Sequence, residues 1–106
     1  MLAQILESER VLGHPYVTGE IALGKVPNRH LVLANLQRLP QANVATHEEF
    51  LHFVEHNSLI GLGIGYVDTH LLASVQLTSG AALLTRDKRL AAVAESMGIL
   101  SRGALH

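Results

Sequence analysis

Residues 65–74 read Gly65-Tyr66-Val67-Asp68-Thr69-His70-Leu71-Leu72-Ala73-Ser74, a stretch that combines an acidic residue with an apolar helical pattern. Apolar residues recur three, four and seven positions after Asp68, which predicts a helix to about Thr78 with Asp68 on its buried stripe. Asp87, the second of only two aspartates, follows an apolar strand predicted over 81–85. Because a lone buried carboxylate is costly, acids placed in this way suggest a divalent-metal site and, with it, phosphodiester chemistry.

The rest of the pattern alternates helices with short apolar runs, which is typical of an α/β fold with a parallel sheet. A first helix is predicted from Leu2, through Ile5 and Leu6, to a stop before Gly13. Thr46 and Glu49 have the spacing of a capping box. The full set of predictions is helices over 2–12, 15–24, 28–39, 46–56, 68–78 and 88–97, and strands over 42–45, 81–85 and 99–101.

Composition indicates one domain, residues 1–106, with a real core, because 48% of its 106 residues are hydrophobic. Only four residues are aromatic Phe or Tyr, so the core is expected to be aliphatic. The net charge of −1 excludes a bulk electrostatic argument for nucleic-acid binding. The absence of Cys fits a reducing cytosol, and no apolar segment approaches the roughly 20 residues needed to span a membrane. We therefore expect a cytoplasmic protein without membrane association.

Each candidate acid has an ordinary structural alternative. Asp68 could simply cap its helix or favour the positive helix end. Asp87 is expected at the carboxyl edge of a sheet, where α/β folds bind ligands, but it is also a good N-cap. Glu20 leans towards the apolar side of a short helix, beside Val17 and Ile21, although a solvated glutamate is the commoner outcome.

Basic residues surround Asp87 and form a candidate phosphate-binding patch. Arg86, Lys88 and Arg89 are three of the eight basic residues, and together with Thr85 we assign them to substrate binding, against the alternative of a solvated charge run.

Two further patterns are weaker. The spacing within Gly61–Gly65 is not that of a phosphate loop, so a flexible loop is favoured. His52 and His56 lie four apart and could bind a metal on one helical face, but no third ligand is near in sequence.

Three segments in this order resemble the PIN-domain ribonucleases, and specifically the VapC-type toxins of bacterial toxin–antitoxin pairs. The segments are His14–Gly24, Ile64–Ser74 and Leu84–Leu90. The resemblance implies a three-layer fold with a short parallel sheet flanked by helices. It also implies Mg²⁺ or Mn²⁺ held by Asp68, Glu20 and Asp87, which cleaves RNA with an activated water. A VapB-type antitoxin and a second copy of the chain are the implied partners.

One departure from that family concerns the first strand. The resemblance implies a central strand ending in another metal-binding aspartate, but no Asp precedes Glu20. We therefore expect residues 1–106 to be an N-terminally truncated PIN-like domain that lacks roughly 15–25 residues. Its sheet is expected to lack the central strand, and its site to be weakened or inactive. The main hypothesis is a metal-dependent endoribonuclease toxin. The alternative is a catalytically inactive PIN remnant that acts as a dimerisation or antitoxin-binding module.

Overall fold

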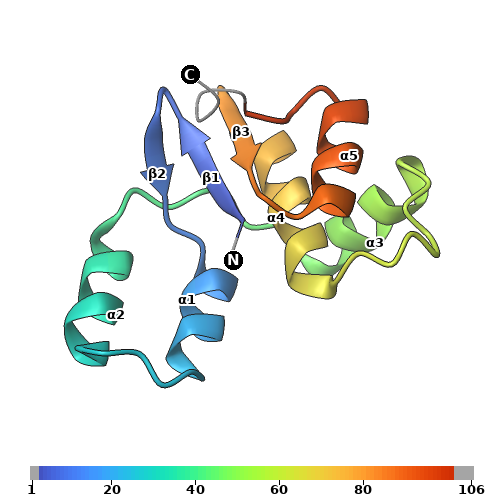
Figure 1. Ribbon diagram of the computed structural model, residues 1–106. Helices are drawn as coiled ribbons and strands as arrows, with labels where there is room; N and C mark the ends of the chain where they lie inside the picture. The colour runs from blue at the N-terminus through green and yellow to red at the C-terminus, as the bar shows by residue number, and fades with distance from the viewer. Residues whose placement is uncertain (1–2, 102–106) are drawn as a thin grey trace.

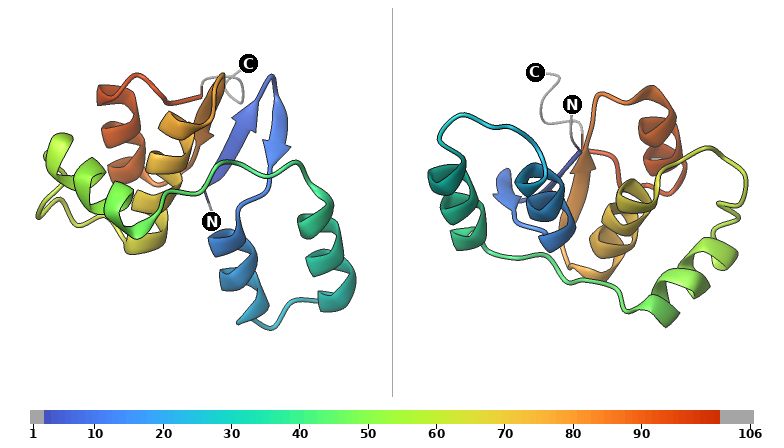
Figure 2. Two further views of the ribbon diagram at one scale, coloured as in Figure 1. Left: turned by 180° about the vertical axis from the view of Figure 1, so that it is seen from behind. Right: turned by 90° about the horizontal axis from the view of Figure 1, so that it is seen from below.

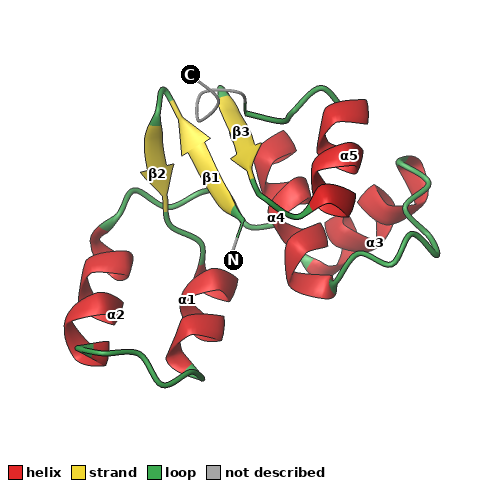
Figure 3. Ribbon diagram, viewed as in Figure 1, coloured by secondary structure: helices red, strands yellow, loops and turns green. Residues whose placement is uncertain are grey.

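The computed structural model describes residues 3–101, and it combines a small sheet with helices (Figures 1 and 3). In chain order the elements are β1 (Gln4–Glu7), β2 (Arg10–Leu12), α1 (Pro15–Ala22), α2 (Arg29–Arg38), α3 (His47–His56), α4 (Tyr66–Leu77), β3 (Ala81–Leu84) and α5 (Lys88–Ser96). The α/β class predicted from the sequence is confirmed, as are the helices that became α1 to α5.

The sheet is antiparallel, so the prediction of a parallel sheet is wrong. Its strand order is β2-β1-β3, and β1 pairs antiparallel with both neighbours. Ile5 lies opposite Leu12 on one side and opposite Leu83 on the other. All three side chains are buried, and this fixes the register because a one-residue slip would turn them to solvent.

The first helix, predicted over 2–12, is also wrong, because residues 4–12 form the hairpin β1–β2. Ser8 and Glu9 join the strands with φ of 51° and 66°, the left-handed geometry of a two-residue hairpin turn. The spacing of Ile5 and Leu6 suits a short strand as well as a helix. The segment forms a strand because it pairs with β3, which is distant in sequence. Within residues 3–101, β1 therefore occupies the centre of the sheet, where a strand was expected to be missing.

Two isolated parallel bridges extend the sheet at its margins. Gly13 bridges to Gln41, and Leu83 bridges to Leu100. The strand predicted over 99–101 is thus represented by one bridge, with the Leu83 N–H donating to Ile99 O at 2.7 Å. The strand predicted over 42–45 is wrong, because that segment is a loop.

Helix α4 is the central helix of the fold and covers the sheet. It packs on β1 and β3, with α3 against its other side. Leu71 and Leu72 of α4, Leu83 of β3 and Leu90 of α5 are at most 1% exposed. Helices α1 and α2 form a separate helical hairpin, seen below the sheet in Figure 1 and apart from α3–α5 in Figure 2.

The capping box at the start of α3 was predicted correctly. The hydroxyl of Thr46 accepts from Glu49 N at 3.1 Å, while Glu49 Oε1 accepts from Thr46 N at 2.7 Å. Pro15 occupies the first turn of α1, where a missing N–H costs nothing. Among the helices of residues 3–101, none has the length and apolarity needed to cross a membrane.

Candidate functional site

Asp68 lies in the first turn of α4, at a point where the helix is open to solvent. The N-cap is Gly65, which has no side chain to satisfy the first backbone N–H groups. Asp68 itself is half-buried, and its carboxylate makes no hydrogen bond or ion pair with the rest of residues 3–101. Its side chain is therefore free to bind a ligand.

Asp87 shares a cavity of about 320 Å³ with Asp68. Asp87 is the N-cap of α5, where its Oδ1 accepts from Leu90 N at 2.9 Å. The hydroxyl of Thr85 accepts from Asp87 N at 3.1 Å and so holds the turn before the helix. The capping alternative for Asp87 is thus realised, and the residue still faces the same cavity as Asp68.

Glu20 shares with Asp68 a cavity that Asp87 does not line. It is an exposed residue of α1 and shares a second cavity, of about 240 Å³, with Asp68. Burial raises the pKa of Asp68 above its usual value, and the charges of Asp87 and Glu20 raise it further. Asp68 is therefore the common member of two acidic pairs.

The three carboxylates do not form one closed set of ligands. No group of three or more His, Asp or Glu side chains between residues 3 and 101 is arranged to hold a metal ion. Glu20 and Asp87 line different cavities. Asp68 shares one cavity with Asp87 and another with Glu20, so the three acids do not share a single cavity as a common metal site would require.

The basic residues beside Asp87 divide into two kinds. Lys88 and Arg89 line the cavity that contains Asp68 and Asp87, whereas Arg86 is exposed outside that lining. Arg89 Nη1 donates to Gly63 O at 3.3 Å, which ties the loop over 61–65 to the start of α5. Gly63 has φ of +76°, and a Cβ there would collide with the guanidinium of Arg89. Arg89 thus orders the loop that leads into the Asp68 helix.

A buried histidine pair that the sequence did not single out connects α1 to α4. His14 is 2% exposed, and its Nδ1 accepts from Tyr16 N at 3.1 Å, so its Nε2–H faces Ser74 Oγ at 2.9 Å. Burial, together with the nearby His70, lowers the pKa of His14 from 6.5 to about 4. His70 stacks on Phe50 with ring centroids 4.2 Å apart. These contacts set the position of α1, and with it Glu20, relative to Asp68.

The signal for His14 was present but ambiguous. It precedes Pro15, which marks a helix start, but His is not among the usual N-cap residues. Its partner Ser74 lies 60 positions away, so no local pattern could pair them.

The fold and the site define an α/β protein with a carboxylate centre at a helix N-terminus, flanked by basic side chains. Comparison with known proteins gives the family. The chain is 44% identical over 98 residues to Ribonuclease VapC32 from two strains of Mycobacterium tuberculosis. The match covers 92% of this chain and 79% of that protein. No family model matches the chain, and no solved structure matches it. The chain belongs to the VapC family.

Proposed function

We propose that this protein is a metal-dependent endoribonuclease, the toxin of a type II toxin–antitoxin pair. The observation that carries the proposal is the position of Asp68 between Asp87 and Glu20, in a chain similar to Ribonuclease VapC32. Burial raises the pKa of Asp68, and the charges of Asp87 and Glu20 raise it further, so an ionised Asp68 lies in a region of concentrated negative charge. A cation would relieve it.

The residues present fit Mg²⁺ or Mn²⁺. Mg²⁺ is commonly held by one or two carboxylates and several waters, so a closed group of three protein ligands is not required. Asp68 and Asp87 would hold the ion, and Glu20 would contribute directly or through water. When bound, the ion would supply an activated water and offset charge on the phosphodiester.

The basic side chains would orient the RNA. Lys88 and Arg89 line the Asp68 cavity, so they are placed to contact phosphates on either side of the scissile bond. Arg86 is exposed next to them and would extend this contact. Thr85 would act on the backbone turn that presents Asp87, through its hydrogen bond to the Asp87 N–H.

The proposed partners follow from the family. A VapB-type antitoxin would mask the acidic cavity, a homodimer would be the assembly, and the cytoplasm would be the compartment where RNA is encountered. Co-expression with a VapB-type antitoxin and light scattering of the purified chain test the first two.

The activity is tested with purified chain, labelled RNA and Mg²⁺ or Mn²⁺. Because no Asp precedes Glu20, only weak cleavage is expected in the wild type. The same weak cleavage is expected in Glu55→Gln, an exposed acid of α3 outside both cavities. Cleavage should be lost with chelator and in Asp68→Asn. Metal-dependent cleavage that persists in Asp68→Asn would refute the proposal.

A second candidate is a catalytically inactive module that dimerises or binds an antitoxin. It is favoured by the absence, among residues 3–101, of a group of three metal-binding side chains. Folded chain that binds the antitoxin but neither binds Mn²⁺ nor cleaves RNA would establish this function instead.

A further inference from the structure

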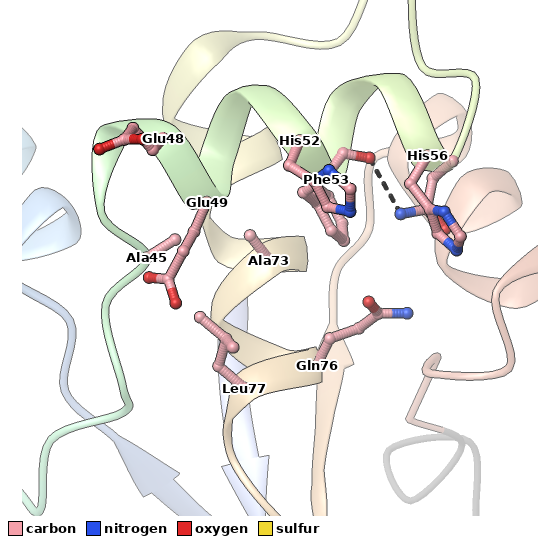
Figure 4. A pocket seen from close by; sticks show the side chains of 10 residues that line it. Ala45, Glu48, Glu49, His52, Phe53, His56, Ala73, Gln76 and Leu77 are labelled. Atoms are coloured by element: carbon pink, nitrogen blue, oxygen red, sulfur yellow. Dashed lines mark hydrogen bonds between the residues drawn. The ribbon is translucent and has the colours of Figure 1, made fainter.

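A groove between α3 and α4 lies apart from the acidic site. It has a volume of about 400 Å³ and shares no lining residue with either cavity of Asp68. Its floor is apolar, formed by Ala45, Phe53, Ala73 and Leu77. Figure 4 shows His52 and His56 on α3 over this floor, with Gln76 of α4 facing them.

The two histidines are arranged as a pair. They are four residues apart, so they lie on one face of α3 in successive turns. Their rings are nearly parallel, at 15°, with centroids 5.8 Å apart. Both side chains are exposed, and neither makes a hydrogen bond or ion pair with any part of residues 3–101. Their ring nitrogens are therefore available to an external ligand.

The surroundings favour a cation. Helix α3 carries Glu48, Glu49 and Glu55 and has no lysine or arginine. The Glu49 carboxylate is engaged in the capping box through Oε1, so its charge stays close to the groove while its position is fixed. An uncharged or anionic ligand would gain nothing from this charge.

We propose that His52 and His56 form a two-nitrogen site for a borderline transition-metal cation, of the class of Zn²⁺, Ni²⁺ or Cu²⁺. Imidazole nitrogens suit these ions, whereas Mg²⁺ and Mn²⁺ prefer oxygen ligands. Water, or the amide oxygen of Gln76 across the groove, fills the remaining positions. Because the described side chains supply only a pair of strong ligands, the site is open to exchange. It is independent of the proposed ribonuclease function.

Binding has a structural consequence within α3. A cation held by both rings links two turns of the helix, so it restricts opening of the backbone between them. Amides over 53–57 are expected to exchange more slowly with solvent when Zn²⁺ is present.

The site is tested by calorimetric titration of the full chain with Zn²⁺, Ni²⁺ and Cu²⁺ at neutral pH, with Mg²⁺ in excess to block the acidic cavity. His52→Gln and His56→Gln should each weaken binding by about tenfold or more, since loss of even an outer partner of a metal ligand costs roughly 10–100-fold. His30→Gln, an exposed histidine of α2, is the matched control and should bind as the wild type does. The titration is repeated in Asp68→Asn, which removes the acidic site, and the binding that depends on His52 and His56 should persist there.

Two results would overturn the proposal. One is transition-metal binding by the His52→Gln/His56→Gln double variant as tight as that of the wild type. The other is hydrogen exchange in α3 that is the same with and without Zn²⁺ in the wild type. Because both histidines are exposed, the variants are expected to fold normally, and unchanged circular dichroism checks this.

Discussion

Acid should destabilise this protein through His14. Its Nδ1 accepts a hydrogen bond from the Tyr16 N–H. Protonation of Nδ1 would replace this hydrogen bond with a repulsive contact between two N–H donors inside the fold. His14 is also 2% exposed and lies near His70, and both factors disfavour a charged ring. The unfolded chain has no such restriction and takes up the proton more readily.

The size of the effect follows from the two pKa values. The pKa of His14 falls from 6.5 to about 4 on folding. At about 1.4 kcal/mol per pH unit, this is about 3 kcal/mol of folding free energy. The depressed pKa belongs to the folded state, so this stability is fully present above about pH 6.5 and is lost as the pH falls towards 4. His70, whose pKa is lowered by burial and by His47, acts in the same direction.

Urea unfolding between pH 7.5 and pH 4 measures this dependence. We expect His14→Gln to lower stability at neutral pH by about 1–3 kcal/mol, because Ser74 loses its partner, and to flatten the pH profile. His30→Gln should keep the wild-type profile, since His30 is exposed. A His14→Gln profile as steep as that of the wild type would refute the assignment of the acid sensitivity to His14.

Three further predictions concern the site and the core, and two of them have a matched control substitution. Asp68→Asn should raise the free energy of unfolding of the metal-free chain by a few tenths to about 1 kcal/mol at neutral pH. The reason is that it removes a carboxylate whose pKa is raised by burial and like charges. This gain in stability should fade in acid, below the ordinary carboxyl pKa of 3.8. Gly63→Ala should cost about 1–2 kcal/mol in the same assay, since its φ is +76° and a guanidinium abuts it, whereas Gly65→Ala, with open space around its Cβ, should cost less. Leu83→Ala, at a position 0% exposed, should lower the free energy of unfolding by about 2–5 kcal/mol. Leu23→Ala, at a position 87% exposed, should lower it by less than about 0.5 kcal/mol.

The elements that could be predicted from sequence are those with local determinants. The capping box at Thr46 and Glu49 is complete within four residues, and α3 begins where it predicts. The Asp68 helix carries its own apolar repeat. By contrast, Ile5 is in a strand because it meets Leu83, and no local pattern contains that partner. The direction of the sheet depends on the same distant pairing, so it was predicted wrongly.

The candidate site divides in the same way. Asp68 and Asp87 were identified from their positions at element ends, and the structure places them on one cavity. The sequence could not show that Glu20 faces Asp68 from another cavity, because this depends on how His14 attaches α1 to Ser74. The hydrogen bond between His14 and Ser74, 60 positions later, forms only in the tertiary structure, so no local sequence pattern predicts it.

The central position of β1 has a kinetic consequence. Its two partners lie far apart in sequence: β2 is the next element, while β3 (Ala81–Leu84) comes after four helices. During synthesis the hairpin can close early, but one edge of β1 stays unpaired until β3 has emerged. Loop closure over so long a separation slows folding, and an exposed edge is a template for aggregation. Completion of the sheet is therefore expected after translation of β3, with the nascent hairpin as the segment that most needs protection by a chaperone.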